Sequence, residues 1–359
     1  ADLSMVRRHD APDPSFPPVP YRPLQGRLQQ YEQPQMIDAT VTKSPTLSSM
    51  IMRKHITALT FAGALVSTME AKASEGRNAA AELIEASLVD DMGAAERIEA
   101  ADVLRTMSQE VAAASCFLYS GIDASESARM MVEGRDKFDL NLDALFFGNA
   151  AMNIIGAETR RKTIVLLEEV KQTWQPMSDA VDTLVTNPTD SAAIKVIKTN
   201  NIALFELTNV LVSEISGQYS NPAELMQVDA ILLDIVGRQG MLTQKISKNA
   251  CKVWNGEEIA RSSEALTGAM QMFETSLKAL LNGMPEAGIV SAPTPEIAAV
   301  LSGVIKDWDT TRPLVDDLLT KGTLGDAEQI SLFRAMNDKM YRLEALAHDY
   351  AIYSKHQYD

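Results

Sequence analysis

Apolar side chains recur at spacings of three and four residues through the segment 221–254. Residues at this spacing share one face of an α-helix. The segment is followed by Asn255-Gly256, and glycine can adopt the left-handed backbone with which many helices end. The pattern therefore predicts one long amphipathic helix, whose apolar face carries Val228, Ile231, Leu232, Ile235, Leu242 and Ile246.

The same pattern predicts three further helices after this one, over 258–282, 294–320 and 325–354. Four equivalent helices are predicted earlier in the chain, over 76–120, 123–147, 157–186 and 190–217. Short connections between successive helices favour antiparallel neighbours. The fold class predicted is therefore all-α, with up-down four-helix bundles.

An internal repeat relates the two sets of helices. A shift of 135 residues aligns Ser108–Gly148 with Thr243–Gly283 without a gap. Farther along the chain the shift becomes 134, and Trp174 then meets Trp308. Such a shared order of rare residues indicates a duplication. We therefore expect two tandem four-helix bundles, at 74–220 and 221–359, joined near Gly217–Pro222.

The first 73 residues have a different composition. Residues 1–51 are rich in proline and polar side chains and show no helical period, so we expect them to be disordered. Residues 52–73 have the layout of a secretory signal peptide: a basic start at Arg53-Lys54, a mostly apolar run, and the small-x-small sequence Ala71-Lys72-Ala73. The apolar run is shorter than the ~20 residues that a membrane-spanning helix needs. The alternative for this segment is an internal buried helix.

A signal peptide with cleavage near Ala73 would make the protein periplasmic or secreted, with a mature chain that begins near Ser74. Translation would then start at Met50 or Met52, and residues 1–51 would result from a gene start assigned too far upstream. The mature protein would work in an oxidising compartment.

Composition excludes several classes of function. The net charge of −15 leaves no basic stripe for displacing phosphate counterions, so we expect no nucleic-acid partner. The chain has two cysteines, four histidines and no CxxC or HExxH motif, so we expect no metal site. It also lacks the GxGxxG, GxxxxGK[ST] and GxSxG motifs. We therefore expect no cofactor and no catalytic residues, and predict that the protein is not an enzyme.

The stretch 234–248 places polar residues and glycines inside a helix with a core-type period. Gln239 lies on the apolar line of this helix, where a buried polar side chain needs a hydrogen-bond partner. Gly237 and Gly240 weaken a helix but permit close approach of another helix or of a ligand. The sequence GRQGMLTQKISK, at 237–248, resembles the GRQRMLSQRIAK signature of PilJ-type sensor domains.

This resemblance implies a fold and a function. PilJ-type domains are the extracytoplasmic input modules of type IV pilus chemotaxis transducers, and they are similar to the periplasmic domain of NarX-type nitrate/nitrite sensors. In the nitrate sensors, an arginine directly before the Met of this helix holds the anion between two first helices. Gly240 stands at that position in the second copy, whereas Arg105 aligns with it in the first copy. Arg238 matches the earlier arginine of the family signature.

We therefore hypothesise that the two copies pack as an intramolecular pseudo-dimer, with Arg105 and Arg238 facing a small anion between their first helices. A guanidinium group binds oxyanions through paired hydrogen bonds. The alternative is that both arginines are solvated or salt-bridged, and that nearby glutamines are polar groups of the core or of the interface. The glutamines that would complete the anion site are Gln109, Gln239 and Gln244.

Cys116 and Cys251 occupy equivalent positions near the ends of the two first helices. Equivalent residues can meet near a pseudo-two-fold axis, and an even number of cysteines in an exported protein is typical of a disulfide. The alternative is two buried free thiols, since cysteine also behaves as a small apolar residue.

The function predicted is that of an exported, non-enzymatic sensory protein. It would bind a small oxyanion such as nitrate or nitrite between the first helices and signal through a membrane receptor or a pilus-system protein. The alternative is a structural or adaptor protein that docks such a component without a small ligand.

Overall fold

The computed structural model describes residues 93–219 and 227–356. Both ranges are almost entirely helical and contain no strand, which confirms the all-α prediction. The predicted disordered segment at 1–51 and the predicted signal peptide at 52–73 lie outside the described residues.

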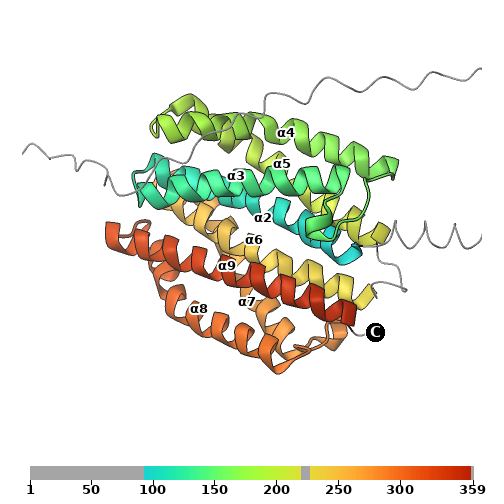
Figure 1. Ribbon diagram of the computed structural model, residues 1–359. Helices are drawn as coiled ribbons and strands as arrows, with labels where there is room; N and C mark the ends of the chain where they lie inside the picture. The colour runs from blue at the N-terminus through green and yellow to red at the C-terminus, as the bar shows by residue number, and fades with distance from the viewer. Residues whose placement is uncertain (1–92, 220–226, 357–359) are drawn as a thin grey trace, which may run out of the picture. The chain divides into compact units, whose positions relative to one another are not determined.

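Eight long helices in the described ranges form two groups of four, which lie on opposite sides of the α2–α6 contact (Figure 1). The bounds agree with the predicted helices to within a few residues wherever both ends are described. The first group contains α2 (Ala94–Tyr119), α3 (Ala124–Phe147), α4 (Arg161–Thr186) and α5 (Ser191–Tyr219). The second group contains α6 (Gln227–Trp254), α7 (Ile259–Asn282), α8 (Pro295–Lys321) and α9 (Asp326–His356).

The 135-residue shift of the sequence also relates local backbone features of the two groups. Asp123 and Glu258 both adopt a left-handed conformation, at φ 42° and φ 43°, directly before the second helix of each group. Each second helix is followed by a short 3₁₀ helix, η1 at Ala150–Met152 and η2 at Pro285–Ala287. The two groups therefore share these backbone features at positions 135 residues apart, and the duplication itself stays a prediction.

Each group has its own aromatic core between its second and third helices. Trp174 stacks on Phe138, and its indole Nε1 donates a hydrogen bond of 2.6 Å to Asp139. Trp308 packs edge-on against Phe273 in the second group. Burial of such rings stabilises a core strongly, and the polar edge of the indole keeps a partner.

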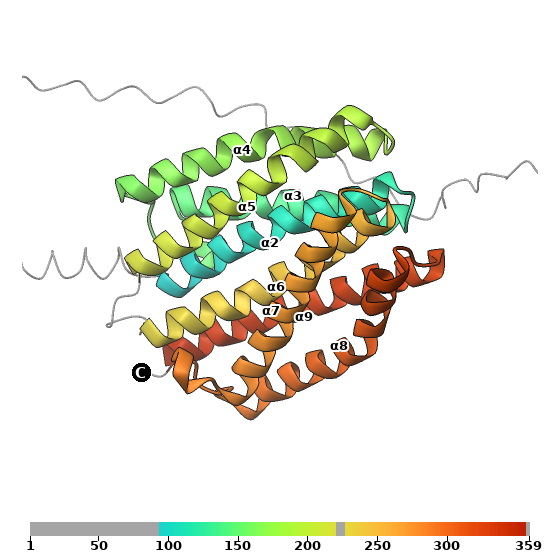
Figure 2. The ribbon, with the colours of Figure 1, turned by 180° about the vertical axis from the view of Figure 1, so that it is seen from behind.

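The two groups meet along α2 and α6, which Figure 2 shows side by side from behind. A Cβ atom added to Gly237 would lie 2.9 Å from the Cβ of Asp102, and Cys116 is bonded to Cys251 farther along. Both pairs join residues 135 positions apart, so α2 and α6 run in the same direction with equivalent residues facing each other. We call this line of contact, from Asp102 and Gly237 to Cys116 and Cys251, the α2–α6 seam.

Helix α2 is enclosed by its neighbours on nearly all sides. It packs against α3, α5 and α6, and its buried residues include the charged or amide side chains of Asp102, Arg105, Gln109 and Glu110. Buried polar groups must find partners inside the protein or destabilise it. The hydrogen bonds of these side chains therefore determine which charged groups in the seam are paired and which could bind a ligand.

We predict that Gly237→Ala destabilises the protein, because the new methyl group would enter the space of Asp102 on the facing helix. Overpacking of this kind costs about 1–3 kcal/mol of unfolding free energy. Gly268→Ala is the matched control, since a Cβ at this exposed position in α7 meets nothing within 4 Å. That substitution should stabilise by about 0.5–1 kcal/mol through helix propensity. Urea unfolding measures both, and equal effects at the two positions would contradict close packing at the seam.

Candidate functional site

Arg105 lies at the centre of a buried ionic cluster in the seam. Its side chain is 1% exposed and forms an ion pair with Asp102 one turn earlier on α2. Its Nη1 also donates to Oδ1 of Asp234 on α6 over 2.8 Å, and its Nη2 donates to the Asp234 backbone carbonyl over 3.1 Å. The guanidinium therefore connects the two first helices through carboxylates of the protein itself.

Arg238 reaches the same carboxylate from the other side. Its Nη2 donates to Oδ2 of Asp234 over 2.6 Å, within α6. Arg105 and Arg238 thus converge, as the pseudo-dimer hypothesis requires, but Asp234 lies between them in the described structure. A free anion at this place would have to displace Asp234 or Asp102, and the anion site at the two arginines stays a prediction.

The second carboxylate of the cluster has unusual acid–base properties. Burial raises the pKa of Asp102 to about 8, although Arg105 acts in the opposite direction. An acid whose pKa lies near neutral pH can exist with or without its proton under ordinary conditions. The charge of the seam near Arg105 is therefore sensitive to anything that changes the burial or the neighbours of Asp102.

Gln239 and Gln244 are fully buried and make their hydrogen bonds within the second group of helices. Nε2 of Gln239 donates to the Ile235 carbonyl over 2.9 Å, in its own helix. Nε2 of Gln244 donates to Oδ1 of Asn337 on α9 over 3.2 Å. Neither glutamine forms a hydrogen bond with Arg105 or Arg238 in the described structure, and the part of the two glutamines in an anion site stays a prediction.

Gln109 belongs to a separate buried hydrogen-bond network. The network includes Lys248, which the sequence did not indicate as a site residue. Oε1 of Gln109 accepts a hydrogen bond of 2.5 Å from Nζ of Lys248 on α6. Lys248 also donates to Oδ1 of Asn201 on α5 over 2.6 Å, and Nδ2 of Asn201 donates to the Ser108 carbonyl over 2.7 Å. Lys248 therefore joins α2, α5 and α6. A comparison of the repeats could have marked it, since the equivalent position of the first copy is Ala113.

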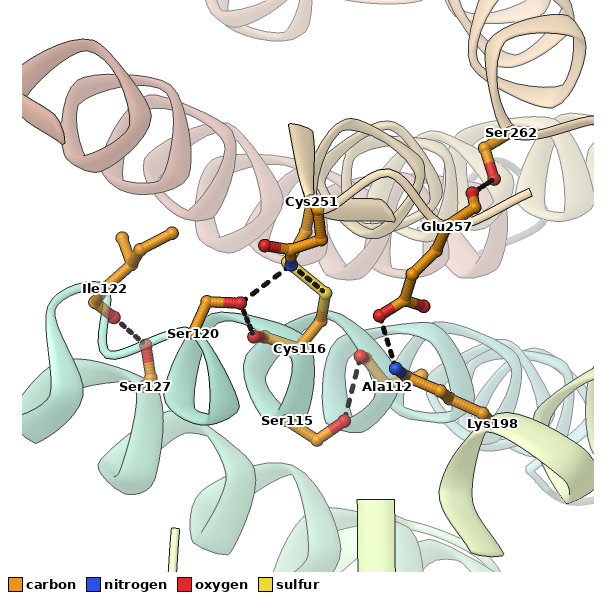
Figure 3. Close-up of a disulfide and its surroundings, with 11 residues drawn as sticks. Ala112, Ser115, Cys116, Ser120, Ile122, Ser127, Lys198, Cys251, Glu257 and Ser262 are labelled. Atoms are coloured by element: carbon orange, nitrogen blue, oxygen red, sulfur yellow. Dashed lines mark hydrogen bonds and ion pairs between the residues drawn. A yellow bond between two sulfur atoms is a disulfide. The ribbon is translucent and has the colours of Figure 1, made fainter. Parts of the chain in front are cut away.

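Cys116 and Cys251 form a disulfide at the other end of the seam, with their Cα atoms 6.3 Å apart (Figure 3). Of the two alternatives for these cysteines, the structure has the bridge. Asn255 after α6 donates to Oγ of Ser120 after α2 over 2.7 Å, so a hydrogen bond between the two helix ends accompanies the covalent bond. The seam is therefore closed covalently at this end and by ion pairs at the other.

A buried carboxyl group, Glu110, lies on the α3 side of α2. It is 1% exposed, and its Oε2 has no hydrogen-bond partner among the described residues. Burial and the nearby charge of Glu344 raise the pKa of Glu110 to about 8, while Lys137 acts in the opposite direction. Glu110 is therefore held in its neutral form below this pH.

A metal-binding cluster and a membrane-spanning helix are both absent from the described residues. Within 93–219 and 227–356, no three or more His, Cys, Asp or Glu side chains gather in a way that could bind a metal ion. None of the helices in these ranges is both long enough and apolar enough to span a bilayer.

Residues 226–330 match the PilJ family model, which is described as the type IV pili methyl-accepting chemotaxis transducer N-terminal domain. The match covers α6, α7, α8 and the first residues of α9. It confirms the PilJ-type resemblance of the segment GRQGMLTQKISK. No curated protein matches the chain.

We predict that Glu110→Gln makes stability less sensitive to pH. The folded protein keeps a proton on Glu110 that the unfolded chain loses, so the stability that this group contributes falls as pH rises from its ordinary pKa of 4.5 to about 8. The variant cannot ionise, so at pH 8.5 its melting temperature should exceed that of the wild type by roughly 3 °C or more. At pH 4.5 the two should melt within about 1 °C of each other if the amide replaces the neutral acid isosterically.

Thermal melts monitored by circular dichroism between pH 4.5 and 8.5 test this prediction. Glu264→Gln, an exposed position on α7, is the control and should leave the pH profile unchanged. Parallel profiles for wild type and Glu110→Gln would contradict the assignment of a buried neutral acid.

We predict that the Cys116–Cys251 bridge contributes about 4–5 kcal/mol to stability, because it closes a loop of more than one hundred residues in the unfolded chain. The double variant Cys116→Ser/Cys251→Ser should therefore melt roughly 10 °C lower than the oxidised wild type. Thiol titration of the unfolded, unreduced protein checks the bond itself. Two titratable thiols in that sample would show that the bridge is absent.

Proposed function

We propose that this chain, whose second group of helices carries a PilJ-type domain, is an exported, non-enzymatic sensory protein in which α2 and α6 form the responsive helix pair. The family supports the sensory role, because PilJ-type domains are input domains of chemotaxis transducers and not enzymes. The single observation that carries the proposal is the seam, where two equivalent helices meet through ion pairs, amides and glycines.

A polar seam supports signalling for a physical reason. Apolar cores interlock closely and strongly favour one arrangement. A buried ionic cluster such as Arg105, Asp102 and Asp234 gives little net stability and depends on exact geometry, so a second arrangement can lie close in free energy. A ligand that binds one arrangement better than the other then shifts the balance. The disulfide would confine such a change to a pivot about the Cys116–Cys251 end.

The disulfide also supports export. Disulfides persist in secreted and periplasmic proteins and are rare where thiols are kept reduced. The Cys116–Cys251 bridge is thus what the predicted signal peptide at 52–73 would lead us to expect. In such a compartment the receiving partner would be a membrane receptor or a pilus-system protein.

The finer form of the proposal makes the ligand a small oxyanion, such as nitrate or nitrite, held by Arg105 and Arg238. For this, the anion would replace the carboxylate of Asp102 on Arg105, and Asp102 would take up a proton. The pKa of about 8 for Asp102 makes this exchange feasible near neutral pH. Binding would then become weaker as pH rises above 8.

The test is amide hydrogen exchange of the full chain with and without nitrate or nitrite, with chloride as the salt control. We expect a changed exchange rate in peptides from α2 and α6 and an unchanged rate in α8. Arg105→Lys keeps the charge but lacks the planar fork that pairs with an oxyanion, so it should abolish the response. Arg129→Lys, in an exposed ion pair with Glu126, is the matched control and should keep it.

A response at the seam that Arg105→Lys abolishes would support both the sensory role and the oxyanion site. A wider screen of small ligands by thermal melting follows if nitrate and nitrite do nothing, since a bound ligand raises stability by RT ln(1 + [L]/Kd). If no small ligand changes melting or seam exchange, the sensory proposal fails and the adaptor alternative takes its place.

A further inference from the structure

A cleft of about 830 Å³ lies beside the seam, between α5, α6 and the start of α7, and the Gln109–Cys116 part of α2 forms its floor. Its volume is in the range of sites that hold small molecules. Helices α5 and α6 both pack on α2 but make few contacts with each other, and this leaves the cleft open between them. Lys198 of α5 and Glu257 after α6 both line the cleft, and Figure 3 shows the two side chains paired with each other.

The cleft is positively charged although the chain as a whole carries a net charge of −15. Its lining includes two carboxylates, Glu257 and Glu258, and both already have basic partners in ion pairs. Six basic side chains line the same space: Lys195, Lys198, Lys245, Lys248, Lys252 and Arg261.

Three of these six cations have no acidic partner in the described part of the chain: Lys195, Lys245 and Lys248. Lys195 is exposed, and Lys245 lies with its Nζ 4.9 Å from the centre of the Phe205 ring. Unpaired cations that share a cleft repel one another, so an anion that enters between them is stabilised by all of them.

Of the three lysines, Lys248 is the one whose ammonium group is held by hydrogen bonds inside the protein. Its two hydrogen-bond acceptors, on Gln109 and Asn201, are neutral amide oxygens. An ammonium group has three N–H donors, so one remains for a ligand. Burial, together with the charges of Lys245 and Lys252, lowers the pKa of Lys248 to about 7. A bound anion would stabilise the charged form of Lys248.

A comparison of the two groups of helices shows that Lys248 has no lysine counterpart in the first group. In the second group of helices, Gln244 is the equivalent of Gln109, and its Nε2 donates to Oδ1 of Asn337. Ala113 stands where a lysine equivalent to Lys248 would be, and Oε1 of Gln244 has no hydrogen-bond partner among the described residues. Gln109 therefore accepts a hydrogen bond from a lysine that lines a cleft, and no lysine occupies the equivalent position beside Gln244.

The cleft also has an apolar part. It includes Ile197, Ile202 and Phe205 of α5, and Ile202 is 45% exposed. A bare inorganic anion would leave this surface in contact with water. A ligand with a carbon frame and more than one negative group would contact both the lysines and the apolar part.

We propose that this cleft binds a small organic di- or tricarboxylate, with one carboxylate on Lys248 and another on Lys245 or Lys195. The inference rests on the proposed sensory function only in treating this ligand as a signal, whereas the binding site stands on the cleft alone. Its position against Gln109 places the ligand within two hydrogen bonds of the seam.

The experiment is isothermal titration calorimetry of the full chain with citrate, succinate and sulfate at pH 6.5 and constant ionic strength. We expect saturable binding of at least one of the two carboxylates, tighter than that of sulfate. Lys245→Gln should weaken it at least fivefold, and Lys248→Met should abolish it. Lys321→Gln is the control, because Lys321 is exposed and pairs with Asp317 at the far end of α8.

Lys248→Met leaves the amide oxygens of Gln109 and Asn201 without their donor, so its fold is checked by circular dichroism. If it does not fold, Lys245→Gln and Lys195→Gln decide the matter, since both change the cleft surface without touching the buried network. No saturable binding of either carboxylate, equal binding of sulfate, or binding unaffected by both glutamine variants would each overturn the proposal.

Hydrogen exchange in the same samples separates this inference from the proposed function. Carboxylate binding without any change in the exchange rates of α2 and α6 would support the binding site and refute its sensory role. A seam that responds to another ligand, in a protein that does not bind citrate or succinate, would refute the site and leave the sensory role intact.

Discussion

The enclosure of α2 by its neighbours is the constraint on which the rest of the structure depends. All residues of this fully described helix are buried except four, which are Glu96, Glu99, Val103 and Tyr119. The hydrogen-bonding groups of its polar residues must therefore find partners on other helices. This requirement fixes the register in which those helices pack against α2. Asp234 of α6 provides a carboxylate for Arg105, and Lys248 of α6 provides a donor for Gln109. The contact between the two groups of helices is polar for this reason.

The two ends of the seam hold α2 and α6 by different means. At one end the Cys116–Cys251 bond is covalent and does not depend on pH in its intact form. At the other end the ion pairs of Arg105 depend on the charge of Asp102, whose pKa is near 8. Buried ion pairs contribute little net stability but strongly penalise a missing partner. The ionic end is thus better suited to specifying and changing the arrangement than to stabilising it.

Most of the fold follows from local sequence signals. The apolar period and the glycines after the helices gave bounds close to those of α3, α7 and α8, because both signals act within one or two turns. The site is harder to predict. Arg105 and Arg238 do converge, yet the carboxylate between them, Asp234, was part of the same conspicuous segment and carried no distinguishing signal.

Lys248 shows the same limit more sharply. Its partners lie 139 and 47 residues away, on α2 and α5, and no local pattern connects them. Its environment arises from the way in which α5 and α6 both rest on α2. Spacing along one helix can show which face is buried, but it does not show which residue of another helix lies opposite.

The differences between the two copies have a common physical origin. In a symmetric dimer of identical helices, each residue on the axis faces itself. Asp102 would then face Asp102, and like charges would meet in a buried place, which is strongly unfavourable. In this chain the residue opposite Asp102 is Gly237, and the position equivalent to Arg105 is Gly240. Because both helices belong to one chain, Asp102 needs to occur only once, and Gly237 on the facing helix leaves room for it. The cysteines are the same in both copies, and a disulfide is a contact that requires the same residue on both sides.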